Sequence, residues 1–295
     1  MLPEERRSRI QDLLSQKATV TIAELAEQFG TSEMTIRRDL DELEGRGVCQ
    51  RIHGGATSLR VQEYRPPPYP SYPQREQCQV REKIAIGQAA AALVRPGDVI
   101  AVDSGTTAAY LAQALRAVCP LTVITNSIRV LDQLHDMIQI ALISPGGTLL
   151  LEERSVVSGD MVFVGPIAVS TLRTFRPSKA FISAAGITVA DGISNAGLFQ
   201  AEIKRTLIEI ADEKILITDH TKFGRVTGFL VAPVQSFTRV ITDTAAPEPD
   251  IAALRAMGID VIQAEPTAET TRLRPSILTA AAGLRPADPC GGSHN

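Results

Sequence analysis

The stretch TSEMTIRRDLDELEGRGVCQRIHGG, residues Thr31–Gly55, decides the fold of the amino-terminal part of the chain. Ser32 is suited to cap a helix, and Glu33 places negative charge in its first turn, where the helix dipole favours it. Apolar residues then recur at the helical period and form one stripe, which consists of Ile36, Leu40 and Leu43. The stretch therefore predicts an amphipathic helix that begins beside Ser32.

The face of this helix opposite the apolar stripe carries Thr35 and Arg38, with Arg37 at its flank. Such a face suits the major groove of DNA, because arginine binds guanine through two hydrogen bonds and threonine contacts the thymine methyl group. The residues from Val48 to Gly55 are typical of a short hairpin, or wing, with a basic tip. The candidate DNA-binding residues are Ser32, Thr35, Arg37, Arg38, Arg51 and His53. The alternative is an ordinary surface helix whose charged face is only solvated.

The segment before this helix favours DNA binding over the alternative. Thr21 and Glu24 have the spacing of a capping box, and Gly30 is of the residue type that commonly follows a helix end. The apolar positions between them are Ile22, Leu25, Ala26 and Phe29. A helix, a glycine-containing turn and a second helix with arginine on its open face form the helix-turn-helix pattern. A first helix is expected at Glu4–Gln16, packed behind the reading helix.

Three stretches carry a family resemblance, namely EERRSRIQDLL, TIAELAEQFGTSEMTIRRDLDELE and RIHGGA. Together they resemble the winged helix-turn-helix of the DeoR family of bacterial transcription regulators. The succession of TIRRDL and HGGA is highly specific to that family. The chain departs from the family pattern at Val48–Gln50, where the wing usually begins with more apolar residues.

The charge balance of the amino-terminal part is unusual for a DNA-binding domain. Residues 1–57 hold eight Lys and Arg against ten Asp and Glu, which gives a net charge of −2. The basic footprint of most nucleic-acid binders is therefore absent. Binding is expected to depend on the local geometry of the arginines and on dimerisation more than on bulk attraction.

Length and composition indicate a globular protein of about two domains, since the chain has 295 residues, 44% hydrophobic and 21% charged. No apolar run approaches the roughly 20 residues that span a bilayer, and the amino terminus lacks the apolar centre of a signal peptide. The cysteines are isolated from one another: Cys49, Cys78, Cys119 and Cys290. We expect a cytoplasmic protein with no metal site, no disulfide framework and no cofactor.

The chain divides into four expected parts. Residues 1–57 form a winged helix-turn-helix DNA-binding domain, 58–79 a Pro-rich linker, 80–264 an α/β effector-sensing domain, and 265–295 a disordered or loosely docked tail. Within the linker, the prolines of Tyr64–Pro73 are dense enough that no helix or central strand is expected there. The predicted fold class is an N-terminal all-α winged helix-turn-helix joined to an α/β sensor domain with a mostly parallel sheet.

The expected sensor alternates between strands and helices, which favours a parallel sheet covered on both faces. The expected helices are Glu82–Leu93, Gly105–Val118, Ser127–His135, Met161–Phe175, Phe199–Ala211 and Ile251–Met257. The expected strands are Asp98–Val102, Leu121–Thr125, Ile138–Ile143, Ala180–Ala184, Lys214–Thr218, Arg239–Thr242 and Ile259–Ile262.

Polar groups follow several of these strands, and the ends of parallel strands meet at one edge of an open sheet, where ligands bind. The candidate effector-binding residues are Asp103, Ser104, Gly105, Thr106, Thr107, Asn126, Gly146, Gly147, Lys204, Asp219 and Lys222. Gly105 allows the backbone to approach a ligand, and the free N–H groups of the helix start suit a phosphate. Lys204, near the expected start of its helix together with Glu202, is a candidate counter-ion for that phosphate. The alternative readings are an ordinary capped turn and solvated helix charges.

The segment of about residues 80–245 also resembles the DeoR family, in this case its sensor domain. The matching stretches are DSGTT, TN at Thr125-Asn126, PGGTL, KAFISAAGI, AEIKRTLI and DHTKFG. That sensor is similar in fold to ribose-5-phosphate isomerase and binds phosphorylated sugars or related esters as inducers. By position, the resemblance implies that Asp103 and Gly105–Thr107 form the phosphate and sugar loop. It implies in the same way that the rest of the site is lined by Asn126, Lys204, Asp219 and Lys222.

The expected function is a repressor of a carbohydrate utilisation operon that a phosphorylated sugar releases from operator DNA. We expect a homo-oligomer, dimer or tetramer, with no membrane partner and no catalytic residues. Two alternatives stay open at this point. One is an isomerase-like enzyme fused to a DNA-binding module, because carboxylates and a lysine are available for proton transfer. The other is an activator of the same family, since DNA binding does not fix the sign of regulation.

Overall fold

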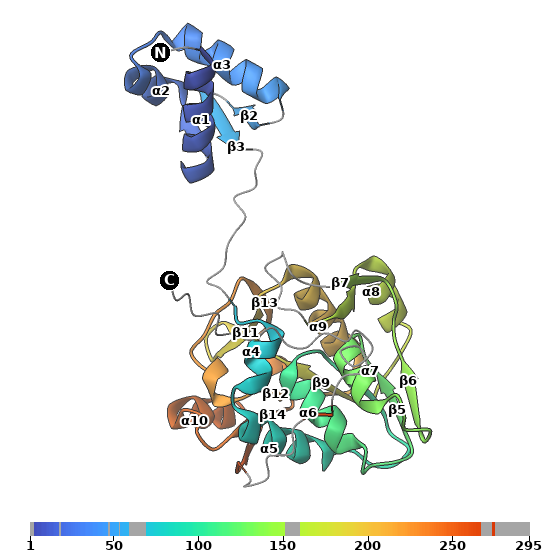
Figure 1. Ribbon diagram of the computed structural model, residues 1–295. Helices are drawn as coiled ribbons and strands as arrows, with labels where there is room; N and C mark the ends of the chain where they lie inside the picture. The colour runs from blue at the N-terminus through green and yellow to red at the C-terminus, as the bar shows by residue number, and fades with distance from the viewer. Residues whose placement is uncertain are drawn as a thin grey trace, which may run out of the picture. The chain divides into compact units, whose positions relative to one another are not determined.

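The computed structural model describes residues 3–17, 19–46, 48–52, 54–58, 69–150, 160–266 and 273–274. The chain forms two compact units, residues 1–67 and 68–295 (Figure 1). The described part of the first unit is a small helical domain with a three-stranded sheet, and the second is built on a seven-stranded sheet. No described helix is long and apolar enough to cross a membrane.

The first unit has the predicted helix-turn-helix. Its elements are α1 (Pro3–Lys17), β1 (Thr19–Thr21), α2 (Ile22–Phe29), α3 (Glu33–Gly45), β2 (Cys49–Ile52) and β3 (Gly55–Ser58). The predicted stripe of α3 is buried and packs against Ile10 and Leu14 of α1 and Leu25 of α2 in one core. Cys49 is fully buried in the same core, so the small thiol replaces the apolar residue usual at the start of the wing.

The predicted helix caps of this unit are confirmed. Thr21 and Glu24 form the capping box, and Gly30 ends α2 in the left-handed conformation with φ 59°. The Ser32 hydroxyl accepts a hydrogen bond from the Thr35 N–H at 3.3 Å and so caps α3. The wing is a hairpin of β2 and β3, and β1, which the sequence did not predict, pairs with β3 to complete the sheet.

A buried carboxylate joins the first and third helices. Asp39 of α3 lies beneath the exposed face, and its Oδ2 accepts a hydrogen bond from Arg6 Nε of α1 at 2.5 Å. A second guanidinium, that of Arg7, lies 3.7 Å from the other oxygen of Asp39. The Arg6 and Asp39 side chains are only 10% and 4% exposed, so charged groups as well as apolar contacts hold α1 against α3.

The second unit contains the predicted parallel sheet. In spatial order its strands are β15 (Asp260–Ala264), β14 (Arg239–Asp243), β12 (Glu213–Ile217), β9 (Lys179–Ser183), β4 (Val99–Val102), β5 (Leu121–Ile124) and β6 (Ile140–Ile143). All neighbouring pairs in this order are parallel. The main helices are α5 (Val80–Ala91), α6 (Thr106–Leu115), α7 (Ile128–Leu134), α8 (Pro166–Leu172), α9 (Leu198–Ile210) and α10 (Glu248–Ala256).

Helices cover both faces of this sheet (Figure 1). Alternate residues of one strand belong to different cores, because successive side chains point to opposite faces. In β4, Ile100 and Val102 pack with α5, α6 and α7, whereas Ala101 packs with the residues of α8, α9 and α10. Burial on both faces explains why the strands are nearly continuous apolar runs.

Two sequence predictions about local structure were wrong. Within the proline-rich segment, helix α4 (Tyr72–Gln77) forms after Ser71, because proline fits the first turn of a helix, where its missing N–H is not needed. Tyr72 is 1% exposed and anchors α4 in the second unit. In the expected helix Met161–Phe175, the first residues instead form strand β8 (Val162–Val164), and only Pro166 onward is helical.

Several short strands were not predicted, because runs of three or four residues beside turns show little periodicity. One group pairs β10 (Gly186–Thr188), β11 (Gly192–Asn195) and β13 (Phe229–Ala232), and another pairs β7 (Thr148–Leu150) with β8. The 3₁₀ turns η1 (His220–Lys222) and η2 (Val234–Ser236) complete the unit. Most of the expected tail, residues 265–295, lies outside the described residues.

Candidate functional site

The first candidate surface is the exposed face of α3. Arg37 and Arg38 are exposed there beside Met34, which is 67% exposed. The Arg37 guanidinium lies 3.2 Å from the Glu33 carboxylate one turn earlier, an exposed pair of small energetic value. The hydroxyls of Ser32 and Thr35 contact each other at 2.9 Å at the start of the helix. The sequence-predicted residues of α3 thus share one exposed face and its amino-terminal end.

The wing is tied to α3 through Arg51. The Arg51 Nε lies 3.2 Å from Asp41 Oδ1, and the Arg51 N–H donates to Glu44 Oε1 at 2.7 Å. These contacts place the Arg51 side chain against α3, where it is 25% exposed, so it is less free than the sequence suggested. The other predicted wing residue, His53, lies outside the described residues.

The second candidate site is a crevice at the carboxyl end of the parallel sheet. Its walls come from α4, the β4–α6 loop, β9, β11, α9 and η1. The lining residues are Tyr69, Arg75, Ser104, Gly105, Thr106, Thr107, Asp160, Ser183, Ala184, Ala185, Asn195, Gln200, Lys204, Asp219 and Lys222. The free space is about 30 Å³, enough for about two water molecules if each needs about 10–15 Å³.

The start of α6 forms one wall of the crevice. Gly105 precedes the helix with φ 106°, a conformation that other residues rarely adopt, and it has no side chain to cap the first N–H groups. Ser104, Thr106 and Thr107 are buried around it. Unfilled N–H groups at a helix start attract anions, so this wall is suited to a phosphate or a carboxylate.

A buried ion pair lies at the base of the crevice. The Lys204 ammonium contacts the Asp103 carboxylate, and their side chains are 2% and 1% exposed. Ser183 donates to the same Asp103 oxygen from its N–H at 3.0 Å and from its hydroxyl at 2.9 Å. Lys204 is in the middle of α9 and not near its start, because the helix begins at Leu198.

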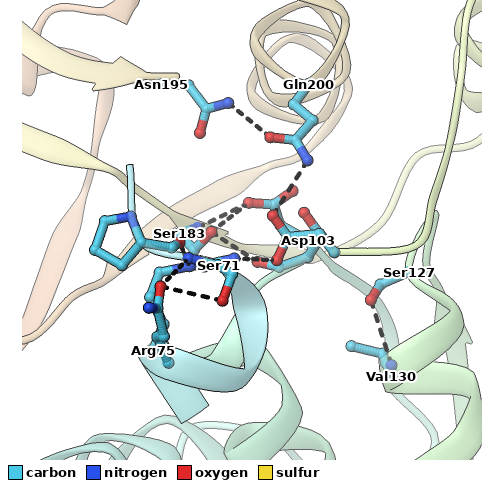
Figure 2. Close-up of polar contacts among 12 residues, drawn as sticks. Ser71, Arg75, Asp103, Ser127, Val130, Ser183, Asn195 and Gln200 are labelled. Carbon is cyan, nitrogen blue, oxygen red and sulfur yellow. Dashed lines mark hydrogen bonds and ion pairs between the residues drawn. The ribbon is translucent and has the colours of Figure 1, made fainter. Parts of the chain in front are cut away.

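A chain of polar contacts crosses the crevice from α4 to β11. The Arg75 guanidinium donates to Asp160 Oδ1 at 2.7 Å, and Gln200 Nε2 donates to Asp160 Oδ2 at 3.2 Å. The Gln200 side-chain oxygen in turn accepts from Asn195 Nδ2 at 2.9 Å. Figure 2 shows Arg75, Gln200 and Asp103 in this region together with Ser183. Arg75 was not predicted to belong to the site, because residues 58–79 were expected to form the linker.

Two further lysines lie near the crevice. The Lys222 ammonium lies 5.7 Å from the centre of the Tyr69 ring, and burial lowers the pKa of Lys222. Burial also lowers the pKa of Lys83, to about 8, and its ammonium donates to the Cys78 carbonyl at 2.6 Å. Asp219 is held by the Thr221 N–H at 3.0 Å. Burial disfavours the charged form of each lysine, so a nearby anion would stabilise that form.

Four of the sequence-predicted residues do not line the crevice, namely Asp103, which is 1% exposed and paired with Lys204, and Asn126, Gly146 and Gly147. Asn126 donates from Nδ2 to the Phe163 carbonyl at 3.3 Å, and its buried Oδ1 has no partner among the described residues. Gly146 and Gly147 follow β6 at the edge of the sheet, where Gly147 packs closely against β8 and α8. Neighbouring strands lie about 4.8 Å apart, so the ends of seven strands span far more than one small ligand.

The crevice offers no evident metal site. Among the described residues there is no group of three or more His, Cys, Asp and Glu placed to hold a metal ion. Its lining instead offers paired charges, hydroxyls and backbone N–H groups, a chemistry suited to a polar anion.

Comparisons with known proteins cover nearly the whole chain. The model of the DeoR-like helix-turn-helix domain matches residues 6–62, and that of the DeoR C-terminal sensor domain matches residues 78–244. The uncharacterized HTH-type transcriptional regulator YulB of Bacillus subtilis is 36% identical over 88% of this chain and 96% of its own length. The uncharacterized HTH-type transcriptional regulator YgbI of Escherichia coli is 36% identical over 90% of this chain and 99% of its own length.

A comparison of structures finds ribose 5-phosphate isomerase A of Methanocaldococcus jannaschii, with a TM-score of 0.34 and 17% identity over 48% of this chain and 53% of the isomerase. The family assignment rests on the two domain models and the full-length relatives. With its helix-turn-helix and its sensor in the same order, the chain belongs to the DeoR family of DNA-binding transcriptional regulators.

Proposed function

We propose that this regulator represses a carbohydrate utilisation operon and that a phosphorylated sugar, bound in the crevice of the second unit, releases it from operator DNA. The observation that carries this proposal is the crevice itself. It brings the uncapped start of α6 together with the cationic side chains of Arg75, Lys204 and Lys222. A helix start and cations around one small space favour a ligand with a phosphate group.

The charges of the crevice are compensated internally in this structure. The Arg75 guanidinium is paired with Asp160, and the Lys204 ammonium is paired with Asp103. Lys222 instead lies against the Tyr69 ring. An entering phosphate therefore meets Lys222 and the α6 N–H groups without first breaking a buried ion pair, and we assign the phosphate to these groups.

The small free volume links binding to a conformational change. A sugar phosphate is much larger than the free space of about 30 Å³, so we infer that a bound ligand requires the walls to separate. One wall is α4, which is separated from the segment 59–68 by three residues along the chain. Movement of α4 thus acts on the segment that leads back to the helix-turn-helix, and this is the proposed route from effector to operator.

The names of two relatives support the carbohydrate assignment. The lactose phosphotransferase system repressor of Lactococcus lactis is 34% identical over 82% of this chain and 92% of its own length. A putative aga operon transcriptional repressor of Escherichia coli O157:H7 is 29% identical over 88% of this chain and 93% of its own length. Both names describe repressors, and we extend that sign of regulation to this chain.

The proposal includes a homo-oligomer that binds repeated half-sites. The first unit alone has a net charge of −2 over residues 1–57, so a single copy gains little from bulk attraction to DNA. Two copies joined through their second units place two reading helices on one duplex. Half-sites are then spaced by about 10 base pairs or a multiple of that repeat.

Replacement of Arg38 with alanine is expected to reduce discrimination between operator and random DNA by about 1–3 kcal/mol. The reason is that the exposed guanidinium on α3 is placed to contact base edges. Fluorescence anisotropy titrations with operator and random duplexes measure the change. Arg173→Ala, which removes the same charge from the exposed residue that follows α8 in the second unit, is the matched control. Unchanged discrimination in Arg38→Ala would show that α3 does not read the base sequence through Arg38.

Replacement of Lys222 with methionine is expected to leave operator affinity unchanged and to make release require about 10–150 times more effector. The reason is the loss of a charge-assisted contact worth about 1.5–3 kcal/mol. A thermal-shift screen of sugar phosphates first identifies the effector, and an operator titration at rising effector concentration then measures release. The wild type is expected to lose operator affinity about 5–150-fold on saturation.

The control for this titration is Lys214→Met, at the other end of the parallel sheet, where the ammonium contacts the Asp212 carbonyl. It is expected to behave as the wild type. Identical release curves for Lys222→Met and Lys214→Met would remove Lys222 from the site. Loss of the sugar phosphate in the same samples, followed by phosphorus NMR, would instead favour the isomerase alternative.

A further inference from the structure

A second hollow lies on the second unit, away from the crevice, between α5 and α6. It has a volume of about 740 Å³ and shares no lining residue with the crevice. Its lining residues are Ile84, Gln88, Ala91, Ala92, Tyr110, Gln113, Ala114, Arg116, Ala117, Val118 and Arg274. We call this hollow the α5–α6 groove. Its surface is mainly apolar, because most of its lining side chains are alanine, valine or isoleucine.

The groove exists because the two helices pack closely at one point and carry small side chains along the rest of their contact. Gly87 of α5 lies against α6, where a Cβ atom would come within 2.8 Å of the Tyr110 carbonyl carbon. The alanines on either side then leave space above the helix contact. An apolar space of this size, left open to water, is a common sign of a docking site.

The rim of the groove holds a residue that is remote in sequence. Arg274 is bound through its backbone by the side-chain amide of Gln133, which donates to the Arg274 carbonyl at 3.2 Å and accepts from its N–H at 3.3 Å. The Arg274 guanidinium lies 2.7 Å from Asp136, a carboxylate that also binds Arg116 at 2.6 Å. Three polar contacts, two of them to the backbone, therefore fix Arg274 at the rim.

The sequence after Arg274 matches the groove in chemistry. Pro275 is followed by SILTAAAGL, residues 276–284, which contain no charged side chain and consist mainly of apolar and small residues. The next charge along the chain is Arg285. Side chains of this kind suit an alanine-lined surface, because they bury apolar area without leaving a charge unpaired.

The length of the segment also suits the groove. Nine extended residues reach about 30 Å, whereas the twelve residues of α5 span about 18 Å. The segment therefore reaches the far end of the groove from the rim in an extended or a more compact form. We propose that residues 276–284 of this chain occupy the α5–α6 groove of the same copy, with Arg274 as the anchor.

The occupant is in the same copy and not a second copy because of effective concentration. A segment tethered one residue away from the rim experiences a local concentration in the millimolar range, well above the micromolar concentration of other copies. The segment then competes with any second copy that would dock on the same apolar surface. The carboxyl-terminal segment of the same copy therefore occupies the groove in preference to a second copy.

The test uses the full chain with Ile277→Asp and Leu278→Asp together. Both substitutions lie outside the described core, so the fold of the two units is retained. Hydrogen exchange followed by mass spectrometry is expected to show amides of α5 and α6 exchanging at least about tenfold faster than in the wild type. A dye that binds apolar surfaces is expected to fluoresce more strongly with the variant. Ala287→Asp, beyond the proposed segment, is the control and is expected to match the wild type.

Equal exchange over α5 and α6 in the variant and the wild type would overturn the proposal. Ala117→Asp, which places a charge in the groove itself, gives a second measurement. Ala117→Asp alone is expected to displace residues 276–284 from the groove. Adding the two tail substitutions to it is therefore expected to cause no further increase in the exchange rate of the α5 and α6 amides. Protection of the wild type that falls on dilution would overturn the same-copy arrangement and assign the groove to a second copy.

Discussion

Replacing Lys204 with methionine is expected to lower the free energy of unfolding of the second unit by about 3–5 kcal/mol. The Lys204 and Asp103 side chains are 2% and 1% exposed, and each compensates the charge of the other. Methionine retains most of the side-chain length but leaves the Asp103 carboxylate buried with hydrogen bonds from Ser183 alone. An uncompensated charge at such a depth has a large desolvation cost.

The matched control for Lys204 is the double variant Lys204→Met with Asp103→Leu. Removing both charges is expected to restore most of the lost stability, because the double variant leaves no buried ion without its partner. The free energy of unfolding of each variant is measured by denaturant unfolding, with hydrogen exchange used to monitor the second unit. An unchanged unfolding midpoint in Lys204→Met would show that Asp103 is neutralised or solvated at little cost. The prediction also means that loss of effector response in a Lys204 variant is not evidence of a direct ligand contact.

The second large effect is expected in the helix-turn-helix. Asp39→Ala removes the carboxylate that binds Arg6 at 2.5 Å and leaves the Arg6 guanidinium, only 10% exposed, against α3 without its counter-ion. The expected cost is again about 3–5 kcal/mol of unfolding free energy, now in the first unit. Because α1 supports α3 through this pair, operator affinity is expected to fall with stability.

Hydrogen exchange measured on individual peptides gives the stability of the first unit separately from that of the second. This separation is needed because the two units need not unfold together. Amides of α1 and α3 are expected to exchange at least a hundredfold faster in Asp39→Ala. The control is Arg9→Ala, which breaks the exposed pair of Arg9 with Glu5 on α1 and is expected to change stability by less than about 1 kcal/mol. Similar exchange in the two variants would show that the Asp39 pair contributes little.

The sequence was most informative where local chemistry determines local structure. The capping box of Thr21 and Glu24, the left-handed Gly30 and the buried stripe of α3 all depend on residues within a few positions of each other. The central strands of the sensor were equally clear, because burial on both faces gives continuous apolar runs. By contrast, the buried pair of Asp39 with Arg6 was not predicted, since the two residues lie 33 positions apart.

The candidate crevice was predictable only in part, for the same reason. The residues of the DSGTT loop follow a recognisable strand, but Asp160 and Gln200 have no local signature and enter the site through the fold. Arg75 was hidden by the prolines before it, whose effect on helix formation depends on whether they lie in the first turn. Asn126 was predicted to line the site because the ends of all parallel strands were expected to meet there, whereas the ends of seven strands spread over a wide edge.

Under the proposed function, the small free space of the crevice has a consequence for the kinetics of induction. The free space is about 30 Å³, so under this proposal the walls separate before the crevice holds a sugar phosphate. The apparent affinity is then the intrinsic affinity reduced by the fraction of open molecules. If opening precedes binding, the observed association rate levels off at high effector concentration, at the opening rate of the walls. Substitutions that loosen α4 would then hasten the response and raise the apparent affinity together, without any new contact to the ligand.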